Sequence, residues 1–302
     1  MRRVLVTGAS GFIGRYSLIL LISKGFEVHA LSSRVTGLIN GVYWHKINLL
    51  KSDDTKILLQ KIRATHLLHF AWYAEPGKFW RSTENFRWLE SSIGLLQYFK
   101  DCGGERVVMA GTCAEYDWSY GVCSESVTPL NPATTYGVCK NVLQQTLRAY
   151  CEEETLSSAW GRVFFLYGPN EHPARLVSSV INALLRGGVA KCTHGNQLRD
   201  FMHVEDVASA FVALLDSTVI GPVNIASGLP VSLREVVNIA ADYIGAQERV
   251  QFGVIPVPQN EPSLLVGNNQ RLLNEVGWNQ QRDLPAGIKE SVDWWKRNLE
   301  EN

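Results

Sequence analysis

The sequence predicts an α/β protein with a Rossmann-type doubly wound parallel sheet and a smaller, interleaved C-terminal lobe. Three observations lead to this fold class. A glycine-rich turn follows an apolar run at the N-terminus, and short apolar runs alternate with helical patterns through the first half. This regular alternation ends after Gly168-Pro169. The length of 302 residues suits one large α/β domain or two closely joined ones.

The glycine-rich turn predicts a dinucleotide-binding loop. Val4–Val6 has the apolar character of a buried parallel strand, and Gly8, Gly11 and Gly14 follow before an apolar helical pattern that runs through Leu21. Strand, turn and helix in this order are the context that a dinucleotide fingerprint requires. Gly8 would permit the tight turn, Gly11 the approach of a pyrophosphate, and Gly14 close packing of the helix. The spacing is G-x-x-G-x-x-G rather than G-x-G-x-x-G, and a glycine-rich surface turn is the alternative.

The remaining elements follow from periodicity. In the first half, strands are predicted over 28–31, 42–47, 66–71, 106–110 and 158–166, and helices over 53–62, 83–99 and 136–154. Such β-α units imply right-handed crossovers, with ligands beyond the carboxyl ends of the strands. In the second half, helices are predicted over 176–185, 204–215, 233–244 and 286–298, strands over 223–225 and 250–252, and a proline-rich loop over 255–262.

The expected organisation is therefore a dinucleotide-binding domain over residues 1–169 and a substrate-binding lobe over residues 170–302. One or two strands of the lobe are expected to return to the main sheet.

Composition narrows the class of protein. The chain is 46% hydrophobic and 19% charged, with a formal net charge of zero, which gives no indication of a nucleic-acid or membrane partner. The sequence has no run of about 18 apolar residues, and Arg2 and Arg3 directly precede the first strand, so neither a membrane span nor a signal peptide is expected. Six cysteines without metal-ligand spacing suggest free thiols in the cytoplasm, and no metal site is expected.

Tyr136 and Lys140 form a candidate catalytic pair. Their spacing of four residues places both side chains on one face of a helix. An ammonium beside a phenol would lower the pKa of the tyrosine, which could then exchange a proton with a sugar hydroxyl or ketone. Thr112 ends the fifth predicted strand, where its hydroxyl could hold the reacting oxygen. Alone, Y-x-x-x-K is a weak signal, and Thr112 could be a turn cap.

Together, T-G-A-x-G-F-I-G, a hydroxyl at the end of the fifth strand and Y-x-x-x-K resemble the extended short-chain dehydrogenase/reductase family, and within it the nucleotide-sugar epimerases, dehydratases and ketoreductases. Later segments are also similar, namely 166–169, 199–206, 224–228 and 276–278. The resemblance implies Thr112, Tyr136 and Lys140 as the catalytic residues. We expect the protein to form a homodimer and to bind a nucleotide sugar as its substrate.

The resemblance also implies a binding site along the chain. The expected cofactor-binding residues are Gly8, Ser10, Gly11, Phe12, Ile13, Gly14, Ser33, Arg34, Asn48, Leu49, Ala71, Tyr136 and Lys140. The expected substrate-binding residues are Trp72, Arg175 and Arg199. Arg199 matches the arginine that contacts the nucleotide diphosphate. Many relatives carry a second arginine near Pro258, and Gln259 or Arg175 could substitute for it here.

Two departures from the family pattern narrow the chemistry. Nucleotide-sugar 4,6-dehydratases place carboxylates one or two positions after the catalytic hydroxyl, where this chain has Cys113 and Ala114. Glu115 comes one step later and, on a strand, would point to the opposite face. The second strand ends in Ser32-Ser33-Arg34 without the acid that holds the ribose of NAD, which favours NADP(H) over NAD(H).

The sequence therefore favours an NADPH-dependent oxidoreductase that reduces the 4-keto group of a nucleotide-linked 4-keto-6-deoxyhexose. A 4-epimerase with tightly bound NAD is the alternative. A non-catalytic NAD(P)-binding regulator is a further one, which the intact Thr-Tyr-Lys set disfavours.

Overall fold

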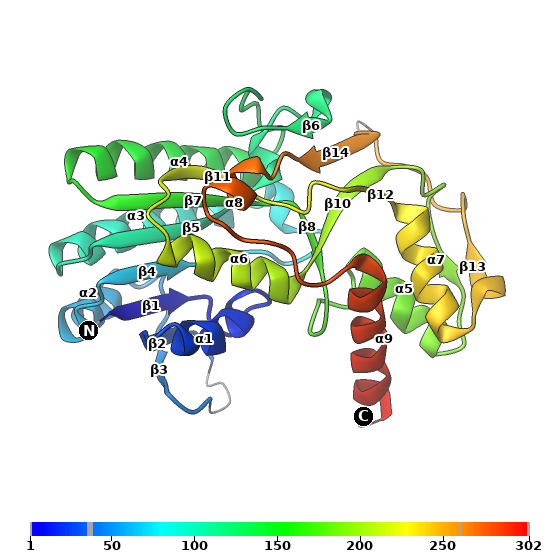
Figure 1. Cartoon of the computed structure of the whole chain (residues 1–302), viewed down its shortest axis with the longest axis horizontal. Coiled ribbons are helices and arrows are strands. Elements are labelled where there is room, and N and C mark those ends of the chain that lie inside the picture. The colour runs from blue at the N-terminus through cyan, green and yellow to red at the C-terminus, as the bar shows by residue number, and fades with distance from the viewer. Residues whose placement is uncertain (1, 35–38, 260, 301–302) are drawn as a thin grey trace.

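The computed structural model describes residues 2–34, 39–259 and 261–300. A seven-stranded parallel sheet forms the larger part of the molecule (Figure 1), in the order β3-β2-β1-β4-β5-β7-β11. Its strands are β1 (Arg3–Thr7), β2 (Glu27–Ser32), β3 (Val42–Lys46), β4 (His66–His69), β5 (Arg106–Thr112), β7 (Ser157–Val163) and β11 (Gly221–Ile225). The order reverses between β1 and β4, so a ligand crevice is expected at the carboxyl ends of these two strands.

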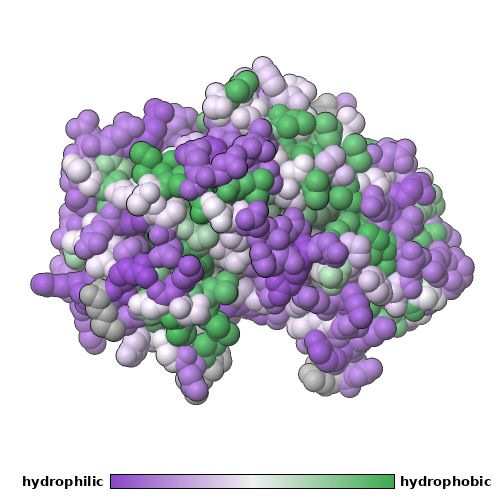
Figure 2. Space-filling view, in the orientation of Figure 1, coloured by the Kyte–Doolittle hydropathy of each residue, from purple (hydrophilic) through white to green (hydrophobic). Residues whose placement is uncertain are grey.

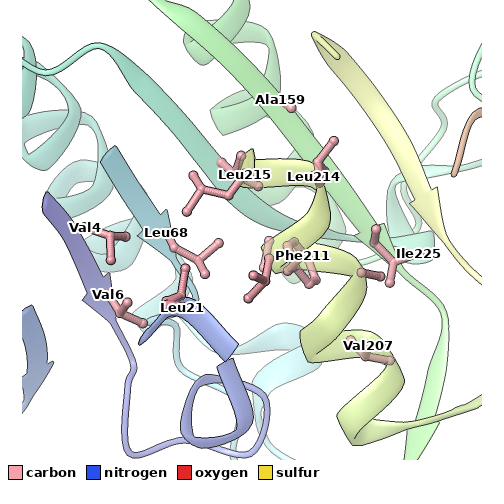
Figure 3. Close-up of a cluster of buried hydrophobic side chains, with 14 of the residues drawn as sticks. Val4, Val6, Leu21, Leu68, Ala159, Val207, Phe211, Leu214, Leu215 and Ile225 are labelled. Carbon is pink, nitrogen blue, oxygen red and sulfur yellow. The ribbon is translucent and has the colours of Figure 1, made fainter. Parts of the chain in front are cut away.

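Helices cover both faces of this sheet. The first face carries α1 (Gly14–Ser23) and α6 (Val204–Asp216), and the second carries α2 (Ser52–Ile62), α3 (Glu84–Asp101) and α4 (Thr135–Glu153). Figure 3 shows α6 directing Phe211, Leu214 and Leu215 toward the strands. These side chains are fully buried, which is the packing that stabilises a doubly wound sheet.

A second, smaller unit lies beyond the carboxyl ends of the parallel strands (Figure 1). In its sheet, β10 (Leu198–His203) pairs with β12 (Pro230–Ser232), β14 (Leu264–Gly267) and β8 (Phe165–Tyr167), and β14 also pairs with β6 (Val122–Cys123). A separate pair joins β9 (Ala190–Lys191) to β13 (Val250–Gln251). The helices of this unit are α5 (Leu176–Leu185), α7 (Leu233–Ile244) and α9 (Leu284–Glu300).

Short turns and one further helix complete the described chain. They are the 3-10 turns η1 (Phe79–Arg81), η2 (Cys113–Glu115), η3 (Trp118–Tyr120) and η4 (Gln247–Arg249), and helix α8 (Gln270–Asn274), which packs beside β11.

The predicted fold class is confirmed, whereas several boundaries differ. The strand expected over 158–166 is divided, because β7 stays in the large sheet and β8 pairs with β10. The strand expected over 66–71 ends at His69, and two residues later the backbone N–H of Ala71 donates to the Thr7 hydroxyl (3.2 Å) instead of to a backbone carbonyl of β1. The strand expected over 106–110 extends to Thr112, paired with β7 throughout. Within the described residues, five short strands of the second unit were not predicted, because two to six residues carry little periodicity; they are β6, β9, β10, β12 and β14.

The surface seen in Figure 2 mixes polar and apolar residues, with apolar residues grouped over the second sheet at the upper right. A hollow of about 300 Å³ lies against this sheet and is bordered by exposed Val122, by Pro230 and by Leu264. Within the described residues, no helix combines the length and the apolar character that crossing a membrane demands.

Candidate active site

The three glycines build a turn that leaves no room for side chains. Gly8 has φ +64°, and a Cβ atom there would lie 2.8 Å from the backbone nitrogen of Ala71 at the end of β4. The N–H of Gly11 donates to the Gly8 carbonyl (2.8 Å), and a Cβ atom on Gly11 would lie 2.9 Å from that oxygen. Gly14 packs against the same carbonyl. Side chains at these positions would clash with backbone, as expected for a loop that lets a ligand approach.

This turn leads directly into α1. In the described part of the chain, no side chain caps this helix, whose first turn also lacks an acidic residue. Phe12 and Ile13 form the turn itself and are partly buried. Free N–H groups and the positive end of the helix dipole suit an anionic diphosphate. The residues present therefore fit a bound dinucleotide.

The end of β2 carries hydroxyl groups and a cation. The hydroxyls of Ser10 and Ser32 hydrogen-bond at 2.8 Å, and the backbone N–H of Arg34 donates to the Ser32 hydroxyl (3.1 Å). Ser33 and the Arg34 side chain are exposed. Residues 35–38 lie outside the described residues.

Two other predicted contacts of the cofactor follow β3. Asn48 is exposed, and its side-chain oxygen accepts from the backbone N–H of Leu50 (3.1 Å). Leu49 is buried, and its carbonyl accepts from the Ser91 hydroxyl (2.6 Å), which attaches this loop to α3. The Asn48 side-chain oxygen is therefore used within the loop, whereas Leu49 is part of the core.

Thr112 and Tyr136 meet although 24 positions separate them in the chain. Thr112 is the last residue of β5, and Tyr136 lies in the first turn of α4, which the Thr134 hydroxyl caps by accepting from the N–H of Gly137 (3.1 Å). The side chains of Thr112 and Tyr136 hydrogen-bond to each other. A phenol and a hydroxyl held together in this way can bind one substrate oxygen between them.

Lys140 lies one turn further along α4 and is buried. Its ammonium donates to the Ala110 carbonyl (2.8 Å) and lies 3.9 Å from the centroid of the Trp72 ring. Burial lowers the pKa of Lys140 to about 7. The Trp72 ring is fixed in turn, because its indole N–H donates to the Asn85 side chain (2.8 Å).

The expectation that Lys140 lowers the pKa of Tyr136 is wrong for this arrangement. Burial raises the pKa of the Tyr136 phenol above its ordinary value, and the hydrogen bond from Thr112 offsets this only in part. The Lys140 ammonium is directed to Ala110 and Trp72 instead. Desolvation therefore dominates both groups and moves both toward their neutral forms.

Aromatic side chains surround Tyr136. The ring centroids of Phe79, Trp80 and Trp72 lie 4.9, 5.7 and 6.5 Å from that of Tyr136, each in an edge-to-face arrangement. Phe79 is buried, whereas the other rings are partly exposed. Sequence reasoning proposed Trp72 and missed Phe79, although the density of aromatic residues between β4 and α3 was a usable signal.

The two predicted substrate arginines lie in different surroundings. The Arg175 guanidinium lies 5.3 Å from the centroid of the Phe79 ring, close enough for its charge to lower the pKa of Tyr136 slightly. Arg199 is buried in β10 and forms an ion pair with Glu261. Arg175 is therefore beside the candidate catalytic tyrosine, whereas a ligand could reach Arg199 only if Glu261 moved.

Glu115 is placed differently from the sequence expectation. Residues 113–115 form the turn η2 rather than a continued strand, so strand alternation does not set the direction of Glu115. Its buried carboxylate accepts from Arg162 Nε (2.7 Å), from the Trp160 indole N–H (3.0 Å) and from the backbone N–H of Thr112 (2.8 Å). These donors occupy both oxygens, so Glu115 fixes the end of β5 and does not supply a free acid.

Other clusters in the described residues give no second site of comparable chemistry. None of the groupings of His, Cys, Asp and Glu found there could hold a metal ion. A hollow of about 620 Å³ is bordered by Thr55 of α2 and by residues of α3 such as Phe86 and Tyr98, and Tyr136 does not line it.

Comparisons with known proteins agree with this geometry. The family described as "NAD dependent epimerase/dehydratase family" matches residues 4–226. The chain is 24% identical to UDP-glucuronic acid decarboxylase 1 of Danio rerio, over 99% of this chain and 74% of that protein. It is 27% identical to dTDP-6-deoxy-L-talose 4-dehydrogenase (NAD(+)) of Aggregatibacter actinomycetemcomitans, over 78% of this chain and 88% of that protein.

Among solved structures, the complex of Thermus thermophilus UDP-glucose 4-epimerase with NAD is similar, with a TM-score of 0.85 and 25% identity over 97% of this chain and 99% of that chain. The relatives thus include decarboxylases, dehydrogenases and epimerases of nucleotide sugars.

Proposed function

Because the chain belongs to the NAD dependent epimerase/dehydratase family, whose members modify nucleotide sugars, we propose that it is a nucleotide-sugar 4-ketoreductase. In this proposal it reduces the 4-keto group of a nucleotide-linked 4-keto-6-deoxyhexose with NADPH. The observation that carries the proposal is the Thr112–Tyr136 pair at the end of β5, followed by residues without a free acid. Cys113 and Ala114 offer no carboxyl group, and the Glu115 carboxylate is held by Arg162 and Trp160.

Each side chain of the site has a separate role in such a reduction. Thr112 and Tyr136 hold the ketone oxygen, and Tyr136 passes its proton to that oxygen as the alcohol forms. A raised pKa keeps Tyr136 protonated at neutral pH, as a proton donor requires. Bound NADPH would supply the hydride. Lys140, whose ammonium donates to the Ala110 carbonyl, would hold the ribose of the bound cofactor. The rings of Phe79, Trp80 and Trp72 limit the access of water.

One relative supports the position of the reaction. The Aggregatibacter protein is named as a dehydrogenase that acts at C4 of a dTDP-linked 6-deoxy sugar. Reduction of a 4-keto sugar is that reaction in reverse. The identity of 27% supports the class of reaction and leaves the nucleotide and the sugar open.

The second candidate is a nucleotide-sugar 4-epimerase with tightly bound NAD. The structural similarity to a UDP-glucose 4-epimerase in complex with NAD favours it. An epimerase needs the same Thr-Tyr-Lys set, since it oxidises and reduces C4 in turn. A non-catalytic NAD(P)-binding regulator is the weakest candidate, because binding alone needs no paired Thr112 and Tyr136.

A single preparation separates the two enzymes. The protein is purified without added cofactor and divided into two portions. One portion is denatured, and its supernatant is analysed for NAD and NADP. The other portion is kept native, and its oxidation of NADPH is followed with dTDP- or UDP-4-keto-6-deoxyglucose. A ketoreductase gives an empty site and steady NADPH oxidation. Tightly held NAD, with interconversion of UDP-glucose and UDP-galactose and no NADPH oxidation, would establish the epimerase.

Arg34→Asp tests the choice of cofactor. In the wild type, a 2′-phosphate would meet the Ser10 and Ser32 hydroxyls and the exposed Arg34. The substitution replaces a cation by a carboxylate that repels this phosphate and can bind a free ribose diol, so the ratio of kcat/KM for NADPH to that for NADH should fall at least about tenfold. Lys46→Asp, an exposed change of the same sign at the end of β3, serves as the control. A wild type that already prefers NADH would contradict the NADP(H) assignment.

The proposal includes a homodimer in the cytoplasm, as expected from the sequence. Light scattering coupled to size-exclusion chromatography would give the mass of the assembly directly. The expected value is twice the chain mass of 33.7 kDa.

A further inference from the structure

Arg199 is a buried cation with one movable partner. It lies in β10 between Val231 of β12 and Leu265 of β14, and its side chain is only 2% exposed. Its guanidinium donates to the Leu198 carbonyl (2.8 Å) and lies 5.5 Å from the centroid of the Phe165 ring. Backbone, a neighbouring strand and an aromatic ring therefore hold it on three sides.

The remaining side is taken by Glu261. This residue belongs to the proline-rich segment before β14, and its carboxylate forms the ion pair with Arg199. The Glu261 side chain is 29% exposed, so the pair reaches the surface through the glutamate and not through the arginine. The backbone N–H of Glu261 donates to the Pro258 carbonyl (3.2 Å), which turns the carboxylate inward. An external anion can reach Arg199 only from the place that Glu261 occupies.

A carboxylate and a phosphate can bind a guanidinium with the same geometry, so they compete for it. Both offer two oxygens to its planar pair of donors, and both neutralise its charge. While Glu261 is in place, the pair carries no net charge, and an approaching diphosphate meets a carboxylate at the entrance. Displacement of Glu261 restores a cation that the rest of the strand holds in position.

We propose that Glu261 is an internal competitor for the nucleotide diphosphate of the substrate, and that this diphosphate binds Arg199 by displacing the Glu261 carboxylate. The inference rests on the proposed nucleotide-sugar substrate. It makes Glu261 a residue that sets nucleotide affinity. Binding costs the free energy of breaking the Arg199–Glu261 pair, so the apparent affinity equals the intrinsic affinity multiplied by the fraction of molecules in which the pair is open.

The test measures the binding of UDP and dTDP, as probes of the diphosphate site, by isothermal titration calorimetry. Glu261→Gln keeps the shape of the side chain and removes its charge. It should tighten the binding of at least one nucleotide by about tenfold, because the competing anion is gone. Glu248→Gln, an exposed change in the same unit whose carboxylate pairs with Arg249, should leave the affinity unchanged. Glu261→Asp, which keeps the charge, should bind more weakly than Glu261→Gln.

Arg199→Met shows whether the effect passes through the arginine. When this change is combined with Glu261→Gln, it should abolish the gain in affinity. Because loss of Arg199 could disturb β10, near-ultraviolet circular dichroism first establishes that the double variant is folded. If it is unfolded, the neutral polar change Arg199→Gln replaces Arg199→Met, with the same expectation.

Three outcomes overturn the inference. Unchanged or weaker nucleotide binding by Glu261→Gln would mean that Glu261 does not compete with the diphosphate. Tighter binding that persists without Arg199 would place the competition elsewhere. Failure of the wild type and the variant to bind either nucleotide would overturn the inference together with the proposed function. The first two outcomes, in which the wild type binds a nucleotide, would overturn the inference alone.

Discussion

Tyr136 places its hydroxyl where burial keeps it protonated at neutral pH. It hydrogen-bonds with Thr112 and packs edge-on against Phe79 and Trp80. The packing contacts involve the ring, whereas the proposed reaction uses the hydroxyl. Removal of the Tyr136 hydroxyl oxygen alone therefore separates the proposed chemistry from the packing of the ring.

Tyr136→Phe removes that atom. Turnover should fall by about 10² to 10⁴, the usual contribution of a general acid, while the melting temperature and the binding of NADPH stay close to those of the wild type. Stopped-flow measurement of a single turnover reports the chemical step directly. Tyr150→Phe, on the same helix and away from the site, is the matched control. A Phe variant that kept more than about a tenth of the wild-type single-turnover rate would exclude Tyr136 as the acid.

Lys140→Met tests the cost of burying an ammonium. The folded protein lowers the pKa of Lys140 from its ordinary value of 10.5 to about 7, so the folded state prefers the neutral amine. The wild type therefore carries the full penalty below about pH 7 and loses it as the pH rises toward the unfolded value. The variant should be more stable than the wild type by up to a few kcal/mol near neutral pH, and this difference should shrink as the pH rises.

Urea unfolding at about pH 6.5 and about pH 9.5 measures this difference, with exposed Lys61→Met as the control. A variant that is less stable than the wild type at both pH values would mean that the hydrogen bond to Ala110 outweighs the desolvation of the ammonium.

At the scale of elements, the junction of β5 with η2 depends on a buried ion pair. Glu115 and Arg162 are both fully buried, and Arg162 also donates to the Tyr116 hydroxyl (3.0 Å), which in turn donates to Asn224 of β11 (2.8 Å). This network joins the strand end that carries Thr112 to β7 and β11. The network therefore supports the strand end at Thr112, whose hydroxyl has a catalytic role in the proposed reaction.

Glu115→Gln should destabilise the protein by about 3 to 5 kcal/mol, because it leaves the Arg162 charge buried and unpaired. The double variant Glu115→Gln with Arg162→Met removes that charge and should recover part of the loss. Denaturant unfolding of the single and double variants gives the coupling energy. If the double variant loses as much unfolding free energy as the two single variants together, the two charges act independently. The pair on the surface of α8, Arg271 with Glu275, offers a control for which the same cycle should give less than about 1 kcal/mol.

At the scale of the whole molecule, the chain crosses between the two units more than once. The chain first enters the second unit as β6 and returns to the large sheet as α4 and β7. After β8 it returns again as α6 and β11, and β11 pairs with β7 along its full length. Phe211 of α6 packs edge-on against Phe70, with ring centroids 4.9 Å apart. The core around the large parallel sheet therefore contains residues from beyond position 169.

A fragment of residues 1–169 should not fold as an independent domain. Without α6 and β11 it exposes the apolar face shown in Figure 3 and leaves β7 as an unpaired edge. Thermal unfolding of the fragment should lack a cooperative transition, and the fragment should bind the dye ANS strongly, unlike the full chain. A sharp transition with little dye binding would show that the boundary after residue 169 separates two autonomous domains.

The sequence by itself determined the features that depend on neighbouring residues. The strand, glycine turn and helix from Arg3 to Ser23, the alternation of strands and helices, and the shared helical face of Tyr136 and Lys140 were all predicted from local periodicity. These features follow from backbone sterics and from the periods of 2 and 3.6 residues, which act over a few positions. Tertiary contacts could adjust their ends but not their type.

Only the tertiary structure decided which partner each charged or polar group finds. It directed Lys140 to Ala110, paired Glu115 with Arg162 and paired Arg199 with Glu261, across separations of 30, 47 and 62 positions. It also raised the pKa of Tyr136, where the local pattern predicted a lower value. Protonation and pairing depend on burial and on contacts between distant segments, because the free energy of a charge is set by everything that replaces its water. The spacing of Tyr136 and Lys140 along one helix carries no information about the groups that surround them.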